Sequence, residues 1–341
     1  MTTFIERKLK VVVQLTPKSS FGFGGTSGED AVRVKKFRLP TEATVNVAGL
    51  PAMDEATIKI YGMAPEDMEA LSFFNFLDRF VVTPSQVAVF AENGDGEADT
   101  LVYAGDIRVA TPDYNSAPNA SITIFGMTGQ FMASAVSSPY SAPGNLPLSE
   151  MIKSILGEYN ELSGQDWNVV DVAKRDLPEL RDVYLQGSTL AKVNAINDLL
   201  EDSRIRVVLQ NGTIYLTTRQ MANREESSNI YRLRSVFGNN GNLLNMVDGA
   251  VVQVDNATYD SPIIGYPEFE DWGIAVKSLY LPNVLVNDRV QVDSIVPRVA
   301  LEGGNYYRVL TFRHSLSSRM TTPGDWFTTL HLTHPQKGAQ R

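Results

Sequence analysis

The sequence from 272 to 333 reads WGIAVKSLYLP (272–282), RVQVDS (289–294), YYRVLTFRHSL (306–316) and DWFTTLHLT (325–333), and these runs decide the fold. Apolar and polar residues alternate in them. Val290 and Val292 share one face of their run, while Gln291 and Asp293 share the other, which is the period of a half-buried strand. Pro and Gly separate the four runs, so they predict a small antiparallel barrel or sandwich.

An earlier part of the chain, 57–128, repeats this order of events. It contains TIKIYGM (57–63), QVAVFA (86–91), a Gly-Asp-Gly turn (94–96), TLVYAGDIRVA (100–110) and, after a polar loop, SITIFGM (121–127). The pattern predicts an architectural repeat with few identical residues. The alternative is two unrelated β segments.

The first copy carries an extra helix, predicted over 64–77. Pro65 stands near its start and acidic residues fill its first turn, where the helix dipole favours them. Met68, Leu71 and Phe74 form an apolar stripe. We expect this helix to pack across one mouth of the barrel or against a neighbouring subunit.

A helix and a hairpin are predicted between the two copies. Ser188 is placed to cap a helix whose apolar residues recur at helical spacing. That helix leads into RIRVVLQNGTIYLTT (204–218), in which Asn211-Gly212 is the residue pair of a type I′ turn. Closure by two residues pairs Leu209 with Ile214 and Val207 with Leu216, which places all four side chains on one face, against the helix.

Segments rich in Pro, Gly, Ser and Asn surround this unit. SSPYSAPGN (137–145) is typical of a linker, and a short helix is expected near 147–159. Residues 223–248 are polar and rich in Asn and Gly, which predicts a second linker or exposed loop. The tail from Pro335 to Arg341 is expected to be disordered.

Composition excludes several classes of protein. The chain has 341 residues, a net charge of −9, a sequence pI near 5.0 and no cysteine. An acidic chain without a basic block lacks the surface that nucleic acid needs. The absence of cysteine excludes disulfides, thiolate metal sites and a cysteine nucleophile. The first residues lack a signal-peptide cleavage site, and no apolar run approaches the ~20 residues of a membrane span. We therefore expect folding in a cytoplasm.

Catalytic and cofactor motifs are weak. His314, His331 and His334 are interpreted as surface residues, because a zinc site needs more ligands on one side. The pairs Asp95/Glu97, Asp198/Glu201 and Glu268/Glu270 are the carboxylate pairs that a glycosidase could use, yet 39 acidic residues produce such pairs by chance. The sequence predicts no catalytic residue, no metal and no cofactor.

The loop 16–30 contains two aromatic residues, Phe21 and Phe23, among glycines and serines. Its glycines resemble a dinucleotide-binding fingerprint, but Ser27 stands where that motif needs Gly and no helix pattern follows. We expect Phe21 and Phe23 to dock on a partner. Together with Met68 and Phe74 they are the candidate interface residues.

A known family matches these patterns. PIIGYPEF (262–269), GIAVKSLYLPN (273–283), NDRVQV (287–292), YYRVLTFRHSL (306–316) and PGDWFTTLHL (323–332) resemble the baseplate hub proteins of tailed bacteriophages, the late-control type related to the hubs of contractile injection systems. The resemblance is clearest over 262–333 and extends loosely over most of the chain. It does not cover the loop FGFGG (21–25).

The resemblance implies a mainly β chain with an α+β middle module. Two tube-type antiparallel β-barrel domains, 1–130 and 226–341, would be joined by a helix–hairpin domain over 131–225. It implies a non-enzymatic homotrimer whose six barrels form a ring between a hexameric tail tube and a trimeric central spike. Expected partners are the tail tube protein, the central spike protein, the tape-measure protein and other baseplate subunits. The expected location is the tail baseplate of a virion assembled in the host cytoplasm.

Two alternatives stay open. One is a baseplate-associated cell-wall hydrolase that uses a carboxylate pair. The other is a distal tail ring protein, which would form hexamers rather than trimers.

Overall fold

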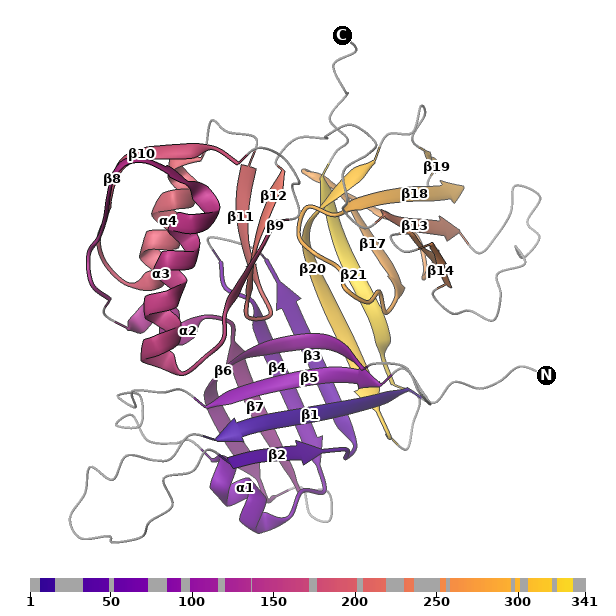
Figure 1. Ribbon diagram of the computed structural model, residues 1–341. Helices are drawn as coiled ribbons and strands as arrows, with labels where there is room; N and C mark the ends of the chain where they lie inside the picture. The colour runs from indigo at the N-terminus through magenta and orange to yellow at the C-terminus, as the bar shows by residue number, and fades with distance from the viewer. Residues whose placement is uncertain are drawn as a thin grey trace, which may run out of the picture.

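The computed structural model describes residues 7–15, 33–48, 52–72, 85–92, 99–115, 120–135, 137–171, 177–200, 205–218, 230–235, 252–255, 258–295, 298–300, 306–320 and 324–333. These residues contain four helices and 21 strands (Figure 1). We divide them into a first module (β1–β7 with α1), a middle module (α2–α4 with β8–β12) and a second module (β13–β21).

The first module consists of β1 (Lys8–Leu15), β2 (Arg33–Phe37), β3 (Thr41–Val47), β4 (Glu55–Tyr61), α1 (Pro65–Leu71), β5 (Gln86–Glu92), β6 (Thr100–Asp113) and β7 (Ser121–Met127). The middle module consists of α2 (Gln130–Ser134), β8 (Tyr140–Pro147), α3 (Leu148–Ser163), β9 (Asn168–Asp171), β10 (Glu179–Leu185), α4 (Thr189–Leu199), β11 (Ile205–Gln210) and β12 (Thr213–Thr218). The second module consists of β13 (Ile230–Ser235), β14 (Val252–Asp255), β15 (Thr258–Ile263), β16 (Glu268–Glu270), β17 (Gly273–Leu279), β18 (Arg289–Ile295), β19 (Arg298–Ala300), β20 (Tyr307–Ser318) and β21 (Trp326–Thr333).

The second module contains a closed barrel of six strands, paired in the circular order β18, β13, β15, β17, β21, β20 and back to β18. The sequence predicted a purely antiparallel barrel. The barrel is mixed instead, because β13 runs parallel to both its neighbours. β13 also lies inside the segment 223–248, which was wrongly expected to be a linker. Its Tyr231 and Leu233 are fully buried, but Arg232 and Arg234, which alternate with them, gave the segment a polar pattern.

The strands of the first module pair in the order β3, β4, β7, β6, β5, β1, β2. In Figure 1, β1, β2 and β5 cross in front of the long strands of this sheet. Among the described residues, the end strand β3 pairs with β20 of the second module rather than with β1. Both modules therefore belong to one continuous sheet and share one hydrophobic core.

The two modules repeat the same strand pairing. The order β5, β6, β7, β4 in the first corresponds to β18, β20, β21, β17 in the second. Each long strand has a register shift at the same place, at Arg108 in β6 and at Leu310 in β20. The residue before each shift donates an equivalent hydrogen bond: Ile107 N to Ser85 O at 2.8 Å, and Val309 N to Asp288 O at 3.0 Å. The predicted repeat is confirmed at the level of strand order and register.

The middle module has its own core and confirms the predicted helix and hairpin. Ser188 caps α4 by accepting a hydrogen bond from Ala191 N, and β11 pairs with β12 in the predicted register. The apolar residues predicted to face the helix are all buried there: Val207, Leu209, Ile214 and Leu216.

The turn of this hairpin lies between the two β modules. Asn211 Oδ1 accepts a hydrogen bond from Ala104 N of β6 at 3.1 Å. Gln210 Nε2 donates to Val284 O of the second module at 2.8 Å. Val208, on the other face of β11, belongs to the core of the β modules. The hairpin therefore ties the middle module to both of them.

The predicted linker 137–145 is instead largely strand. β8 pairs with β10 in a two-stranded ribbon that is irregular between Arg181 and Val183. Gly144 has φ +78° at this irregularity, and its N–H donates to Asp182 Oδ1 at 2.8 Å. A ribbon edge tolerates prolines because it needs fewer N–H donors. The helix expected near 147–159 is confirmed as α3.

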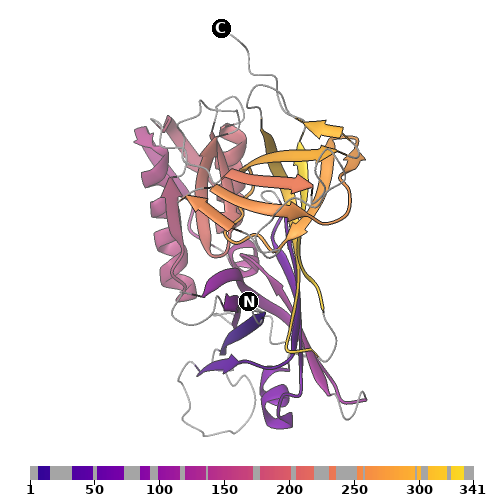
Figure 2. The same ribbon diagram turned by 90° about the vertical axis from the view of Figure 1, so that its right-hand side faces the viewer.

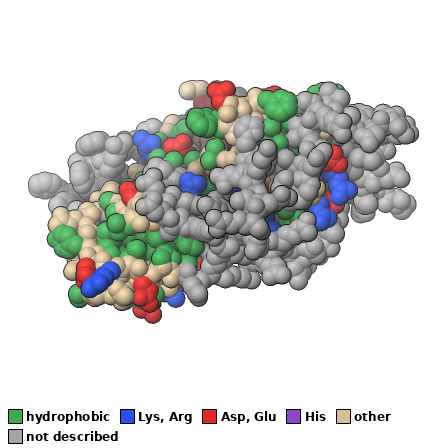
Figure 3. All heavy atoms as spheres, turned by 90° about the horizontal axis from the view of Figure 1, so that it is seen from above, with side chains coloured by type: hydrophobic (Ala, Val, Ile, Leu, Met, Phe, Trp, Pro, Cys, Tyr) green, Lys and Arg blue, Asp and Glu red, His purple; other side chains and the backbone are tan. Residues whose placement is uncertain are grey.

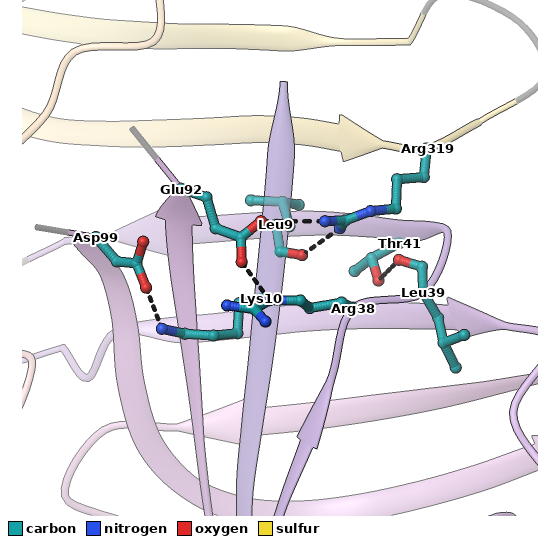
Figure 4. A network of polar contacts seen from close by, with 8 residues as sticks. All are labelled: Leu9, Lys10, Arg38, Leu39, Thr41, Glu92, Asp99 and Arg319. Carbon is teal, nitrogen blue, oxygen red and sulfur yellow. Dashed lines mark hydrogen bonds and ion pairs between the residues drawn. The ribbon is translucent and has the colours of Figure 1, made fainter. Parts of the chain in front are cut away.

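β1 is joined to the second module by side-chain hydrogen bonds rather than by strand pairing (Figure 4). Arg319, just beyond β20, donates Nη1 to Leu9 O of β1 at 2.7 Å and Nη2 to Glu92 Oε2 of β5 at 3.0 Å. Arg38 Nε binds the other oxygen of Glu92 at 2.5 Å, and Lys10 pairs with Asp99. The guanidinium group of Arg319, from the second module, therefore holds β1 and β5 in place.

We expect Arg319→Ala to destabilise the chain by about 2 kcal/mol, because it removes two hydrogen bonds of a charged donor and leaves a partly buried carboxylate with one partner fewer. Urea unfolding followed by tryptophan fluorescence measures the change. Arg319→Lys is the control, since it keeps the charge but not the two-pronged geometry, and should recover less than half of the loss. Equal stability of the three proteins would contradict this role.

Candidate assembly surface

One face of the shared sheet is buried and the other is open. Figure 2 shows the long strands of both modules side by side, running most of the length of the molecule. On the inner face of these strands, Val45, Ile58, Ile124 and Leu330 are fully buried. Their neighbours in sequence point outward, because side chains alternate along a strand. We call the outward side of β17, β21, β20, β3, β4, β7 and β6 the open face.

The open face consists largely of short hydroxyl side chains and charged residues of both signs. Directly paired residues share a face, so the register assigns its members. They are Lys277; Phe327, Thr329 and His331; Thr311, Arg313 and Ser315; Glu42, Thr44 and Asn46; Thr57 and Lys59; Thr123 and Phe125; and Val109 and Thr111. Three of these residues are basic, namely Lys277, Arg313 and Lys59, and the one acidic residue among them, Glu42, lies opposite Lys59. Such a face is suited to line an aqueous space.

An aromatic hairpin stands at one end of this face. We give this name to Tyr266–Gly273, which includes β16. Tyr266, Phe269 and Trp272 are 66%, 66% and 77% exposed. Large aromatic side chains this exposed are typical of a contact surface. The acids of β16 lie beside them, and Glu270 binds His331 Nδ1 at 2.9 Å.

The middle module exposes a second group of apolar side chains: Leu162, Val170, Tyr184 and Leu199. Seen from above, hydrophobic side chains gather on the left, which is the side of α3, α4, β8 and β10 in Figure 1 (Figure 3). This group lies apart from the aromatic hairpin in sequence and in module, so the two surfaces can be tested separately.

A cavity of about 320 Å³ lies where the three modules meet. Four parts of the chain line it: β6, the β11–β12 hairpin near its turn, the loop that follows β17, and β20. The lining residues are Leu101 and Val102; Gln210, Asn211, Thr213 and Tyr215; Tyr280, Asn283, Val284 and Leu285; and His314. Among the residues that the structure describes, this lining contains no carboxylate. It therefore lacks the paired acids of a glycoside hydrolase.

The sequence analysis interpreted His314 as a surface residue, and this was wrong. His314 is buried. Its Nδ1 lies 2.9 Å from Thr328 Oγ1, and its ring packs against Tyr280 and Phe312. Burial lowers the pKa of His314 to about 3, so the ring is neutral in the folded chain. The register shift at Leu310 turns this part of β20 over and brings His314 inside.

We expect the folded chain to lose stability in acid through His314. In the unfolded chain this histidine has its ordinary pKa near 6.5, so below that pH it binds a proton that it does not bind in the folded chain. The free energy of unfolding therefore falls as pH drops from about 6.5 toward 3. Between pH 6.5 and 4.5 the loss from this group is about 2 kcal/mol. His314→Gln should remove that part of the pH dependence in urea titrations. His331→Gln, at a partly exposed histidine, is the matched control.

The candidate interface residues fall in different places. Met68 is fully buried in the core of the first module, so any contact of α1 with a neighbour would use other residues of this helix. Phe21, Phe23 and Phe74 lie outside the described residues and stay predictions. Of the carboxylate pairs that the sequence analysis attributed to chance, Glu268 and Glu270 are both exposed on β16, and neither lines the cavity described above.

No group of three or more metal-binding side chains occurs among the described residues. No helix in the described ranges is long and apolar enough to cross a membrane.

Comparison with known proteins gives structural matches only. No protein-family model matches the chain, and no curated protein matches it by sequence. The tail protein from Neisseria meningitidis MC58 is similar at a TM-score of 0.55 and 11% identity, over 96% of both chains. The 43 kDa tail protein of prophage MuSo2 from Shewanella oneidensis is similar at a TM-score of 0.50 and 8% identity, over 95% of this chain and 96% of that one. The chain has the fold of a phage tail protein.

This tail-protein fold agrees with the resemblance predicted from the sequence. The sequence did not single out the aromatic hairpin as a surface. Trp272 was quoted only as the first residue of a predicted strand run, and Phe269 only as part of the family pattern. The available signal was the alternation of aromatic and acidic residues in GYPEFEDW (265–272), which a buried strand would not carry.

Proposed function

We propose that this chain is a structural hub subunit of a phage tail baseplate. Three copies form a ring of six similar barrels, two from each chain, which joins the hexameric tail tube to the trimeric central spike. The tape-measure protein and other baseplate subunits are further partners. The chain performs no catalysis in this role.

The observation that carries the proposal is the repeat inside one chain. Two modules with the same strand order, the same register shift and the same hydrogen bond beside it offer two nearly equivalent surfaces per chain. Three such chains can present six equivalent surfaces to a sixfold partner while keeping threefold symmetry for another. A chain with one module would need six copies for the same match.

The open face supports the same proposal. It extends without interruption from the second module to the first through the pairing of β20 with β3. In a ring it would face the central channel, where its hydroxyl groups and few charged groups stay hydrated and offer no strong binding site to a passing chain. The aromatic hairpin, at its end, would then face a neighbour.

Native mass spectrometry over a range of concentrations tests the proposal. We expect a species with three times the mass of the 37.6 kDa chain, and class averages of its electron micrographs with six lobes around a channel. A species of six chains would favour a distal tail ring protein. Release of soluble fragments from purified cell walls would favour the hydrolase.

A further inference from the structure

The internal repeat also relates strands of the two modules to one another residue by residue. The position of β16 in the second module corresponds to the second half of β3 in the first. Thr44, Val45 and Asn46 pair with Thr57, Ala56 and Glu55 of β4. Glu268, Phe269 and Glu270 pair with Ala275, Ile274 and Gly273 of β17.

These two sets are equivalent because β4 and β17 hold equivalent places. Glu55 pairs with Met127 of β7, and Met127 pairs with Asp106 of β6. In the second module Gly273 pairs with Thr333 of β21, and Thr333 pairs with Arg308 of β20. Asp106 and Arg308 each stand two residues before the register shift of their strand. The residues of β6, β7, β4 and β3 in the first module therefore correspond one by one to those of β20, β21, β17 and β16 in the second.

Within the chain, β3 uses its other edge to pair with β20, and Asn46, Val45 and Thr44 lie opposite Arg313, His314 and Ser315. Val45 and His314 are both buried in this contact. The equivalent edge of β16 pairs with no strand in the part of the chain that the structure describes. Phe269, the counterpart of Val45, is consequently exposed.

The long strand β6 has a matching free edge. Its pairing with β5 ends at Asp106, whereas its pairing with β7 continues to Asp113. Counting from the register shift, Thr111 and Pro112 of β6 correspond to Arg313 and His314 of β20. No strand among the described residues pairs with the outer edge of Val109–Pro112.

We propose that β16 of one copy adds to this outer edge of β6 in the next copy, in the register that β3 and β20 use inside the chain. This inference rests on the proposed function and names its subunit contact. Phe269 lies opposite Pro112 of the next copy, and Glu270 lies opposite Thr111. Each ring junction then repeats the junction that already joins the two modules of one chain.

The chemistry of the two edges fits a contact made late in assembly. Pro112 has no N–H, so the edge of β6 cannot form a complete ladder with an arbitrary strand, which protects a free chain against aggregation. The aromatic hairpin supplies the missing attraction, because Phe269 and Trp272 bury large apolar areas when the edges meet. Glu268 lies opposite Asp113, so association strengthens with ionic strength as this repulsion is screened.

Cysteine crosslinking of the full chain tests the register, since the chain contains no cysteine of its own. Directly opposed Cβ atoms of an antiparallel pair lie about 4.5–5.5 Å apart, close to the ~3.5–4.5 Å that a disulfide needs. The test variant carries Glu268→Cys with Asp113→Cys. Thr44→Cys with Ser315→Cys is the equivalent pair inside the chain, and Glu268→Cys with Thr111→Cys is shifted by two residues.

Under mild oxidation we expect the test variant to run as a crosslinked closed trimer without reductant, while the internal pair stays monomeric. The shifted pair should crosslink between chains at least ~10-fold more slowly. Equal rates for the test and shifted pairs, or no link between chains, would overturn the strand contact. A native trimer without the crosslink would contradict this contact alone. A crosslinked hexamer or an open series of products would support the contact and contradict the trimeric ring.

Discussion

Gly105→Ala is expected to destabilise the chain by about 3 kcal/mol, because its new Cβ would enter the space of the Tyr103 ring. That Cβ would lie 2.8 Å from Tyr103 Cζ and 3.1 Å from the carbonyl carbon of Met127. Tyr103 is fully buried, so the ring cannot swing into solvent. Overpacking of this kind costs about 1–3 kcal/mol and at times more. The shift of the urea midpoint measures the effect.

Two variants make this result specific. Tyr103→Phe removes the hydroxyl that meets the new methyl group, and in the double variant it should restore part of the loss. Gly157→Ala is the matched control: Gly157 lies exposed in α3, with nothing within 4 Å of the added Cβ. It should stabilise the chain by ~0.5–1 kcal/mol through helix propensity. A Gly105→Ala protein as stable as the Gly157→Ala protein would refute the packing described for Tyr103.

Phe269→Asp is expected to weaken association of the copies by at least ~100-fold while leaving the monomer folded. The residue is 66% exposed in the single chain, so its loss costs the monomer little. In the proposed contact it becomes the buried anchor between β16 and β6, where truncation of an aromatic residue has its largest effect. Sedimentation equilibrium measures the dissociation constant, and thermal unfolding checks the fold.

Tyr184→Asp is the control for this experiment. Tyr184 is 60% exposed on β10, in the middle module and away from both edges of the proposed contact. Association should be unchanged in this variant. If both substitutions weaken association alike, the loss comes from general surface charge, and the aromatic hairpin is not the contact.

Local patterns predicted the parts of the fold that depend on neighbours in sequence. The Asn211-Gly212 turn fixed the register of β11 and β12, because a two-residue turn leaves no freedom in pairing. Alternation located most strands, and repeated order revealed the two modules. These features depend on side-chain period and turn chemistry, which a single sequence contains.

Features that depend on distant contacts were missed. The pairing of β20 with β3 joins segments at opposite ends of the chain, and no periodicity encodes such a partner. The shift at Leu310 reverses the inward side of β20, so alternation counted from Tyr307 and Val309 would place His314 outside, and no sequence pattern marks the shift. Phe269 is exposed because no described strand pairs with the outer edge of β16, and the presence or absence of such a neighbour is decided by distant parts of the chain.

The most direct test of the central claim is an electron cryomicroscopy reconstruction of the assembled tail end, computed without imposed symmetry. We predict three copies of the chain around the axis. Each copy supplies two barrels, at alternating positions of a six-membered ring. Six copies supplying one barrel each, or a ring in which the regions 1–130 and 226–341 occupy unlike positions, would contradict it.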